Sequence, residues 1–240
     1  MRNDYKLIAF DLDETLTHSF TPIEKSNLTL LHALCKKYRL LVVSAGSCER
    51  IHAQLGGFPL DILGNYGMQR SHPDPVTGAP VIARNITVVP DRKRVEELAT
   101  ALRRKHGLEH YVGDSIKYQE SGMFSIALAG TAVGLSEKLA FDPDHSRRLA
   151  LIEDARAAFP GATVFIAGAA SLDIVPSPYN KLYALDRYCA EHGFSHRDVL
   201  FCGDDYGTGG NDEQVYLSDI DFVKVDDYRH LPTLLSHLLD

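Results

Sequence analysis

The chain has 240 residues, of which 45% are hydrophobic and 24% are charged, and its formal net charge is −7. This balance is typical of a soluble globular protein with one large domain or two smaller ones. The negative charge argues against nonspecific binding to nucleic acid or to an anionic membrane as the main function, and it leaves open a local site for a small anion.

The cysteines indicate a reducing environment. Four are present, none forms a C-x-x-C pair, and their spacing matches no zinc site. The first strand begins soon after the N-terminus, with no signal-peptide pattern and no run long enough to cross a membrane. We therefore expect reduced, buried thiols and a cytoplasmic protein.

The first predicted element is a buried strand over Leu7 to Phe10, which ends at Asp11 and Asp13. A strand of this kind places both carboxylates at the carboxyl edge of a parallel sheet, where α/β proteins bind ligands. Ionised carboxylates are costly at a core edge unless they are paired or bound to a metal, so we expect a cation there. Taken alone, the pair is equally compatible with a simple strand end and turn.

The next elements indicate a parallel sheet. A helix is predicted over Thr21 to Tyr38, with Thr21 as N-cap, and a buried strand over Arg39 to Ser44 follows it. A short helix over residues 48–55 and a strand over Asp61 to Asn65 come next. Alternation of strand and helix predicts right-handed crossover connections.

An inserted α+β domain is predicted over residues 80–177, after a segment rich in proline and glycine. Its expected strands cover residues 82–89, 111–118, 123–128, 163–167 and 171–176, and its expected helices cover residues 90–106 and 146–159. The α/β pattern then resumes with a helix over 179–192, a strand over 199–202, a short helix over 212–217, a strand over 222–225 and a helix over 228–239. The core domain would therefore consist of residues 1–79 and 178–240.

Four sets of polar residues follow core strands or open the helix after the insertion. They are Asp11 with Asp13, Ser44, Lys181, and Gly203-Asp204-Asp205, the last followed by the glycine-rich loop 207–212. Together they offer a nucleophile, an acid/base, a hydroxyl, an ammonium and further carboxylates, a set that suits phosphoryl transfer with a hard divalent metal. Alone, Lys181 would be an ordinary surface lysine and Ser44 a helix cap.

These four sets, in this order, resemble the motifs of the haloacid dehalogenase-like (HAD) superfamily, and the insertion resembles its type IIB cap. The resemblance implies a Rossmann-like parallel-sheet core with an inserted α+β cap domain. A closer resemblance, to eukaryotic-type phosphomannomutases, rests on Asn65-Tyr66-Gly67, Gly122 to Ile126, Ser171 to Pro176 and Gly203 to Tyr216. In the first motif, Glu14 stands where the mutases have glycine.

The resemblance also implies residue roles. Asp11 would attack phosphorus and form an aspartyl phosphate, and Asp13 would act as acid and base, which requires an environment that raises its pKa. The resemblance implies that Mg²⁺ is bound by Asp11, the carbonyl of Asp13, Asp204 and Asp212. It implies that the phosphoryl oxygens are bound by Ser44, Lys181 and Asn211. Whether Asp212 or Asp205 ligates the metal directly stays open.

The cap differs from that of the mutases at its phosphate-binding positions. Glu120 and Thr131 stand where arginines are expected, and the segment from Thr17 to Lys25 also lacks one. A glutamate repels phosphate and the bidentate contact of arginine is lost, whereas candidate substrate-binding residues of the cap are kept: Ser125, Ser171 and Asp173.

We therefore expect a Mg²⁺-dependent phosphohydrolase that acts on a small phosphorylated metabolite such as a sugar phosphate. The alternatives are a phosphomannomutase and a catalytically silent binding protein. A monomer and a cap-mediated homodimer both stay open.

Overall fold

The computed structural model describes residues 2–239. They divide into two compact units. The core unit comprises the chain up to Ile86, Lys181–Tyr206 and the chain from Asp212 onward, and the insertion unit comprises Thr87–Asn180 and Gly207–Asn211.

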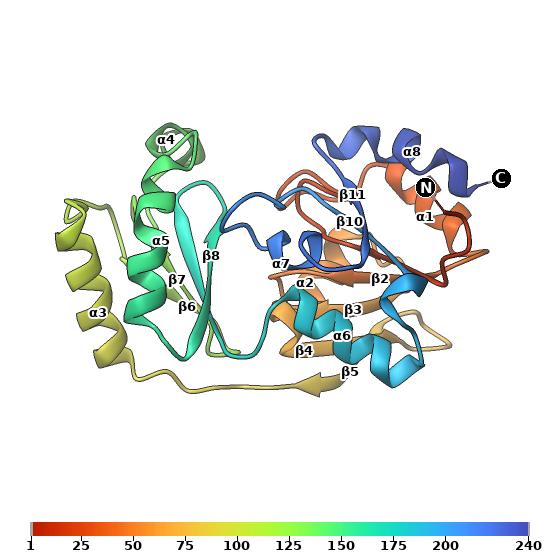
Figure 1. The fold of residues 1–240 in the computed structure, drawn as a ribbon, viewed down its shortest axis with the longest axis horizontal. Helices are drawn as coiled ribbons and strands as arrows, with labels where there is room; N and C mark the ends of the chain where they lie inside the picture. The colour runs from red at the N-terminus through yellow and green to blue at the C-terminus, as the bar shows by residue number, and fades with distance from the viewer. Residues whose placement is uncertain (1, 240) are drawn as a thin grey trace. The chain divides into compact units, whose positions relative to one another are not determined.

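The core unit is built on a seven-stranded sheet with the order β11-β10-β1-β2-β3-β4-β5 (Figure 1). Its strands are β1 Leu7–Phe10, β2 Arg39–Val43, β3 Asp61–Gly64, β4 Gln69–Pro73, β5 Pro80–Asn85, β10 Val199–Gly203 and β11 Asp221–Lys224. The five strands from β11 to β3 are parallel, and β4 and β5 are antiparallel. The parallel part places the ends of β1, β2 and β10 at one edge of the sheet.

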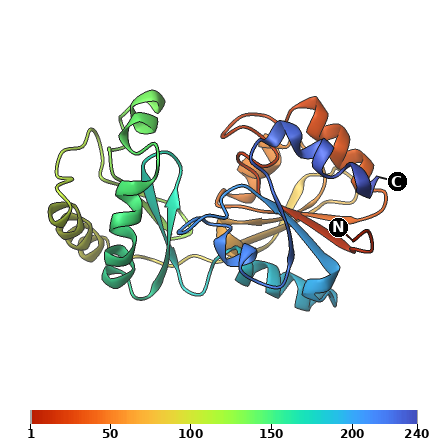
Figure 2. The same ribbon diagram turned by 45° about the horizontal axis from the view of Figure 1, so that its top comes forward.

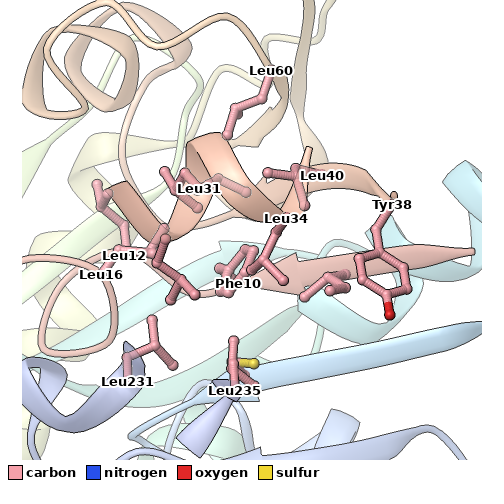
Figure 3. Close-up of a cluster of buried hydrophobic side chains, with 14 of the residues drawn as sticks. Phe10, Leu12, Leu16, Leu31, Leu34, Tyr38, Leu40, Leu60, Leu231 and Leu235 are labelled. Atoms are coloured by element: carbon pink, nitrogen blue, oxygen red, sulfur yellow. The ribbon is translucent and has the colours of Figure 1, made fainter. Parts of the chain in front are cut away.

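Helices cover both faces of this sheet, because alternate strand residues are apolar on each side. Ile8 and Phe10 belong to a buried cluster with residues of α1 (Lys25–Leu34), α2 (Cys48–Gln54) and α8 (Leu231–Leu234), part of which Figure 3 shows. Leu7 and Ala9 pack on the opposite face with residues of α6 (Lys181–His192) and α7 (Glu213–Tyr216). Each fully buried leucine of such a cluster contributes about 1.5–3 kcal/mol. The expected Rossmann-like core is confirmed.

The insertion unit has an antiparallel sheet with two long helices on one face (Figure 2). The strand order is β6-β7-β9-β8, and the bounds are β6 Ile116–Tyr118, β7 Phe124–Ala127, β8 Ala162–Ala167 and β9 Ser171–Pro176. The helices are α3 Arg92–Lys105, α4 Leu135–Phe141 and α5 Ser146–Ala158. Alternate residues such as Ile126 and Leu172 pack against α3 and α5, so this unit has its own hydrophobic core.

Short 3₁₀ segments complete the chain: η1 Asn65–Gly67, η2 His196–Asp198, η3 Tyr228–His230 and η4 Ser236–Leu238. Two of them divide the long terminal helix that the sequence predicted over residues 228–239, in which only α8 is α-helical. Within residues 2–239, every helix is too short or too polar to cross a membrane.

Two further predictions were wrong at their boundaries. α1 begins at Lys25, because the hydroxyl of Thr21 donates to the carbonyl of His18 instead of capping a helix. The strand expected at the start of the insertion is β5, which pairs with β4 in the core sheet. The carboxylate of Asp74 accepts hydrogen bonds from the backbone N–H groups of Val76 and Thr77, so the breaker-rich segment is a hairpin turn. The insertion unit accordingly begins at Thr87.

Candidate active site

Three aspartates of the core unit converge at the carboxyl edge of its sheet. Asp11 follows β1, and its N–H donates to the carbonyl of Cys202 in β10 at 2.9 Å. Asp204 follows β10, and Asp212 immediately precedes α7. Ligand oxygens of the three carboxylates all lie within 4.8 Å of one another. A side chain at Gly203 would place its Cβ 2.5 Å from Oδ2 of Asp212, so only glycine allows this approach.

One ammonium group faces this cluster. Lys181, the first residue of α6, is 1% exposed, and its Nζ lies 2.7 Å from Oδ1 of Asp11 and 2.7 Å from Oδ1 of Asp212. Burial opposes its positive charge, but the charges of Asp11 and Asp212 outweigh that effect and raise the lysine pKa. Lys181 is therefore held as a cation between two carboxylates.

The three carboxyl groups outnumber the single positive charge of Lys181. Burial raises the pKa of Asp11 to about 6 against the attraction of Lys181, and burial together with the nearby Asp11 and Asp212 raises the pKa of Asp204 to about 9. The pKa of Asp212 is also raised, first by burial. A buried set of oxygen donors with excess negative charge fits a hard divalent cation such as Mg²⁺.

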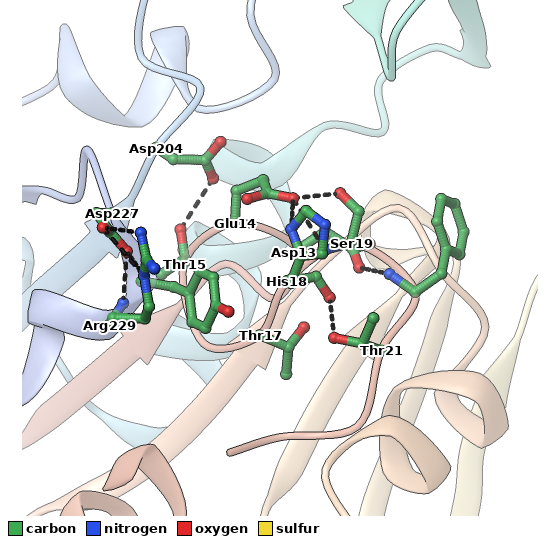
Figure 4. A network of polar contacts seen from close by, with 12 residues as sticks. Asp13, Glu14, Thr15, Thr17, His18, Ser19, Thr21, Asp204, Asp227 and Arg229 are labelled. Carbon is green, nitrogen blue, oxygen red and sulfur yellow. Dashed lines mark hydrogen bonds and ion pairs between the residues drawn. The ribbon is translucent and has the colours of Figure 1, made fainter. Parts of the chain in front are cut away.

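Two neighbours orient these donors. The hydroxyl of Thr15 donates to Oδ1 of Asp204 at 2.9 Å (Figure 4). The backbone N–H of Asp205 donates to Oδ2 of Asp212 at 3.2 Å. The cluster thus includes the carboxylate of Asp212, while Asp205 contributes a backbone contact to it.

Asp13 has a different environment from the one its expected acid role requires. Its Oδ1 accepts hydrogen bonds from Nε2 of Gln54 at 2.8 Å and from the N–H of Phe20 at 3.0 Å, and its Oδ2 lies 3.0 Å from Nη2 of Arg50. Burial acts to raise its pKa, but the charge of Arg50 and these hydrogen bonds outweigh it, and the pKa is lowered. The expectation of a raised pKa was wrong, and Asp13 is an ionised carboxylate here.

Sequence reasoning missed the two α2 residues that hold Asp13. Arg50 and Gln54 are four residues apart, so they share one face of the helix, and Nη1 of Arg50 also donates to Oε1 of Gln54 at 2.9 Å. The sequence signal that could have identified them is a pair of polar residues four positions apart in the helix that follows Ser44.

The other predicted residues fall in two places. Ser44 is buried and follows β2 directly. Its N–H donates to the carbonyl of Leu63, and its carbonyl accepts a hydrogen bond from the N–H of Tyr66. It therefore lies at the same sheet edge as Asp11. Asn211 belongs to the loop that groups with the insertion unit, and its phosphate-binding role stays a prediction.

The substrate-binding candidates of the cap lie on the insertion sheet. Ser125 and Asp173 are register partners, and the serine hydroxyl donates to Oδ1 of Asp173 at 2.6 Å. Ser171 lies on the same strand as Asp173, two residues before it. Their binding role also stays a prediction.

The fold is one that HAD-superfamily enzymes share. Solved structures of similar fold include an IMP-nucleotidase of Plasmodium falciparum, with a TM-score of 0.71, 12% identity and coverage of 98% of this chain and 68% of that one. A HAD-superfamily phosphatase from Bacteroides thetaiotaomicron is similar at a TM-score of 0.60 and 14% identity, with coverage of 98% of this chain and 95% of that one. At these identities the likeness concerns the fold.

The chain belongs to the eukaryotic phosphomannomutase family, whose sequence profile matches residues 104–225, just over half of the chain. A probable phosphomannomutase of Caenorhabditis elegans is 25% identical over 231 residues, covering 89% of this chain and 87% of the relative. The phosphomannomutase of Saccharomyces cerevisiae is 24% identical over 221 residues, covering 89% and 85%. The expected resemblance is confirmed. The expectation that the protein is an enzyme of the HAD phosphatase and phosphomannomutase class is confirmed as well.

Proposed function

We propose that the protein is a Mg²⁺-dependent phosphohydrolase that cleaves a small phosphomonoester through an aspartyl phosphate. The observation that carries the proposal is the buried cluster of three carboxylates with one ammonium group, which contacts two of them, Asp11 and Asp212. Because the carboxylates outnumber the ammonium group, the cluster can bind a divalent cation together with a phosphoryl group. A metal ion held by Asp11, Asp204 and Asp212 would neutralise phosphoryl oxygens.

The first half-reaction depends on Asp11 and Lys181. A carboxylate oxygen of Asp11 forms a bond to phosphorus while the bond from phosphorus to the leaving oxygen breaks. Lys181 keeps Asp11 ionised through its 2.7 Å contact and offers its charge to the phosphoryl oxygens. Ser44, at the same sheet edge, is proposed to donate its hydroxyl to a phosphoryl oxygen.

The second half-reaction suits the ionised state of Asp13. A water molecule gives its proton to the Asp13 carboxylate, its oxygen bonds to phosphorus, and the bond between phosphorus and Asp11 breaks to release inorganic phosphate. The lowered pKa of Asp13 keeps it available as this base at neutral pH. In the first half-reaction Asp13 protonates the leaving oxygen from its minor protonated form.

The choice of water as acceptor rests on the residues that replace the expected arginines. Glu120 is an exposed carboxylate, and the hydroxyl of Thr131, after β7, accepts a hydrogen bond at 2.8 Å from the N–H of Asp114, which precedes β6. Neither side chain has the paired N–H donors with which an arginine would bind a second phosphate group. A mutase has to bind both ends of a bisphosphorylated intermediate, whereas a hydrolase needs one phosphate site.

The sugar-phosphate class is proposed from the polar pair of the insertion sheet. Ser125 and Asp173, with Ser171, present hydroxyl and carboxylate groups that suit a polyhydroxylated substrate. A cytoplasmic location fits the four free cysteines, three of which are buried. Monomer and homodimer are both compatible with this proposal.

Phosphomannomutase activity is the second candidate, and the family match favours it. Phosphate release from a panel of sugar phosphates, with Mg²⁺ or with EDTA and with or without a hexose bisphosphate activator, separates the two. We expect Mg²⁺-dependent release that needs no activator. Interconversion of mannose 1-phosphate and mannose 6-phosphate with little release would instead establish the mutase.

A further inference from the structure

An exposed aromatic ring lies beside the proposed acid/base. Phe20 is 80% exposed, and its φ of +57° is in the left-handed region, which is costly for a bulky side chain. A single exposed apolar residue is ordinary. Backbone strain that displays an aromatic ring at a catalytic carboxylate is different, because strained residues concentrate at functional sites.

The loop that carries Phe20 is fixed by polar contacts. Oε1 of Glu14 accepts hydrogen bonds from the N–H and the hydroxyl of Ser19 at 2.9 and 2.7 Å, and Nδ1 of His18 lies 2.8 Å from the same oxygen (Figure 4). The loop therefore holds its conformation without burying the ring of Phe20.

Arg50 connects the ring to the reacting centre. Its guanidinium carbon lies over the ring of Phe20, 5.0 Å from the centroid, and its Nη2 is 3.0 Å from Oδ2 of Asp13. The backbone N–H of Phe20 donates to the other oxygen of Asp13. One arginine thus fixes the ring and the carboxylate together, and cation–π contact of this kind orients an aromatic side chain.

We propose that Phe20 is a specificity-determining residue whose ring packs against the flat face of a ring in the leaving group, with Arg50 as its positioning residue. The argument rests on the proposed function, in which Asp13 protonates the leaving oxygen. The leaving group then begins next to Asp13, and its first ring meets the exposed face of Phe20. The substrate class is a phosphomonoester of a ring-bearing alcohol, either a sugar or an aromatic compound, in preference to an acyclic one.

The test compares substrates that share a phosphate and differ in the leaving group: glucose 6-phosphate, p-nitrophenyl phosphate and glycerol 1-phosphate. For Phe20→Ala we expect about a tenfold fall in kcat/KM for at least one ring-bearing substrate, mainly through KM, and a change of less than about twofold for glycerol 1-phosphate. Phe20→Tyr should retain the wild-type preference and Phe20→Leu should lose it. Val76→Ala, at an 89% exposed site in the β4–β5 turn, is the matched control.

The two ring-bearing substrates distinguish a sugar face from an aromatic face as the natural contact. An equal fall for all three substrates in Phe20→Ala would overturn the proposal. So would a Phe20→Leu variant that matches Phe20→Tyr, which remains decisive if the alanine variant is inactive throughout. Absence of Mg²⁺-dependent phosphate release from wild-type protein would contradict the proposed function itself, which is a separate result.

Discussion

In the insertion unit Asp142 and Arg148 form a buried one-to-one ion pair, whereas in the core unit a cluster of three carboxylates has one ammonium, Lys181, which contacts two of them. Both members of the insertion pair have 1% exposed side chains, and Nε of Arg148 lies 2.7 Å from Oδ2 of Asp142. Nη1 of Arg148 donates to the carbonyls of Ala167 and Gly168, and Nη2 donates to the carbonyl of Asp142. Every charge of this pair is therefore satisfied within the unit.

The pKa values of the two clusters move in opposite directions. Burial would raise the pKa of Asp142, but hydrogen bonds from Arg148 and from the N–H groups of Arg147 and Arg148 outweigh it, and the pKa is lowered. In the core cluster, burial and mutual repulsion prevail, and the pKa of Asp204 is raised to about 9. The charges of Asp142 and Arg148 neutralise each other. The core cluster instead has excess negative charge, which destabilises the folded chain until a cation binds.

The largest effect on stability is expected at the satisfied pair. Asp142→Asn leaves the guanidinium of Arg148 buried without a counter-charge, so we expect a loss of about 3–5 kcal/mol in the free energy of unfolding of the insertion unit. Urea denaturation followed by circular dichroism measures this change. Glu153→Gln, which breaks a surface pair with Arg156, is the control and should change stability by less than about 0.5 kcal/mol. Equal effects in the two variants would contradict a structural role for the buried pair.

Removing a carboxylate from the unsatisfied cluster should have the opposite sign. Asp204→Asn removes a carboxyl group that folding must either protonate or leave charged beside Asp11 and Asp212, so in EDTA we expect the variant to be at least about 1 kcal/mol more stable than the wild type. Mg²⁺ at a hundredfold excess over its dissociation constant should stabilise the wild type by about 2.7 kcal/mol and the variant by much less. Thermal denaturation with and without Mg²⁺ provides the comparison. A variant that responds to Mg²⁺ as the wild type does would exclude Asp204 as a ligand.

The pH dependence of unfolding sharpens the contrast further. Because the pKa of Asp204 is about 9 and that of Asp11 about 6 in the folded chain, the folded state retains protons that the unfolded chain releases near pH 4. In EDTA, stability should therefore fall as the pH rises from about 5 to 9, and Mg²⁺ should weaken that slope. Asp142, with its lowered pKa, contributes stability above pH 4 that is lost on further acidification. Urea titrations at each pH in EDTA that show constant stability from pH 5 to 9 would contradict the raised pKa values.

The sequence predicts the charged centre better than its surroundings. Strand ends at Asp11 and Asp204 follow from apolar runs that stop at carboxylates, and the order of the motifs identifies Lys181. The clamp of Arg50 and Gln54 on Asp13 depends on how α2 is rotated against the sheet, which spacing alone does not determine. The prediction that places β5 in the insertion is wrong, because a hairpin turn and a domain linker have the same proline- and glycine-rich composition.

The most direct test of the account is to trap the covalent intermediate. Asp13→Asn removes the base of the second half-reaction and also the acid of the first, and it leaves Asp11, Lys181 and Asp204 unchanged. Because p-nitrophenolate leaves without a proton, the variant should accumulate phosphoenzyme when it is mixed with p-nitrophenyl phosphate and Mg²⁺. Mass spectrometry after acid quenching should find one added phosphoryl group on the peptide that contains Asp11. Asp11→Asn and the Asp13→Asn variant in EDTA should remain unmodified. Rapid phosphate release by the wild type with no phosphoryl group on Asp11 in the Asp13→Asn variant would contradict the central claim.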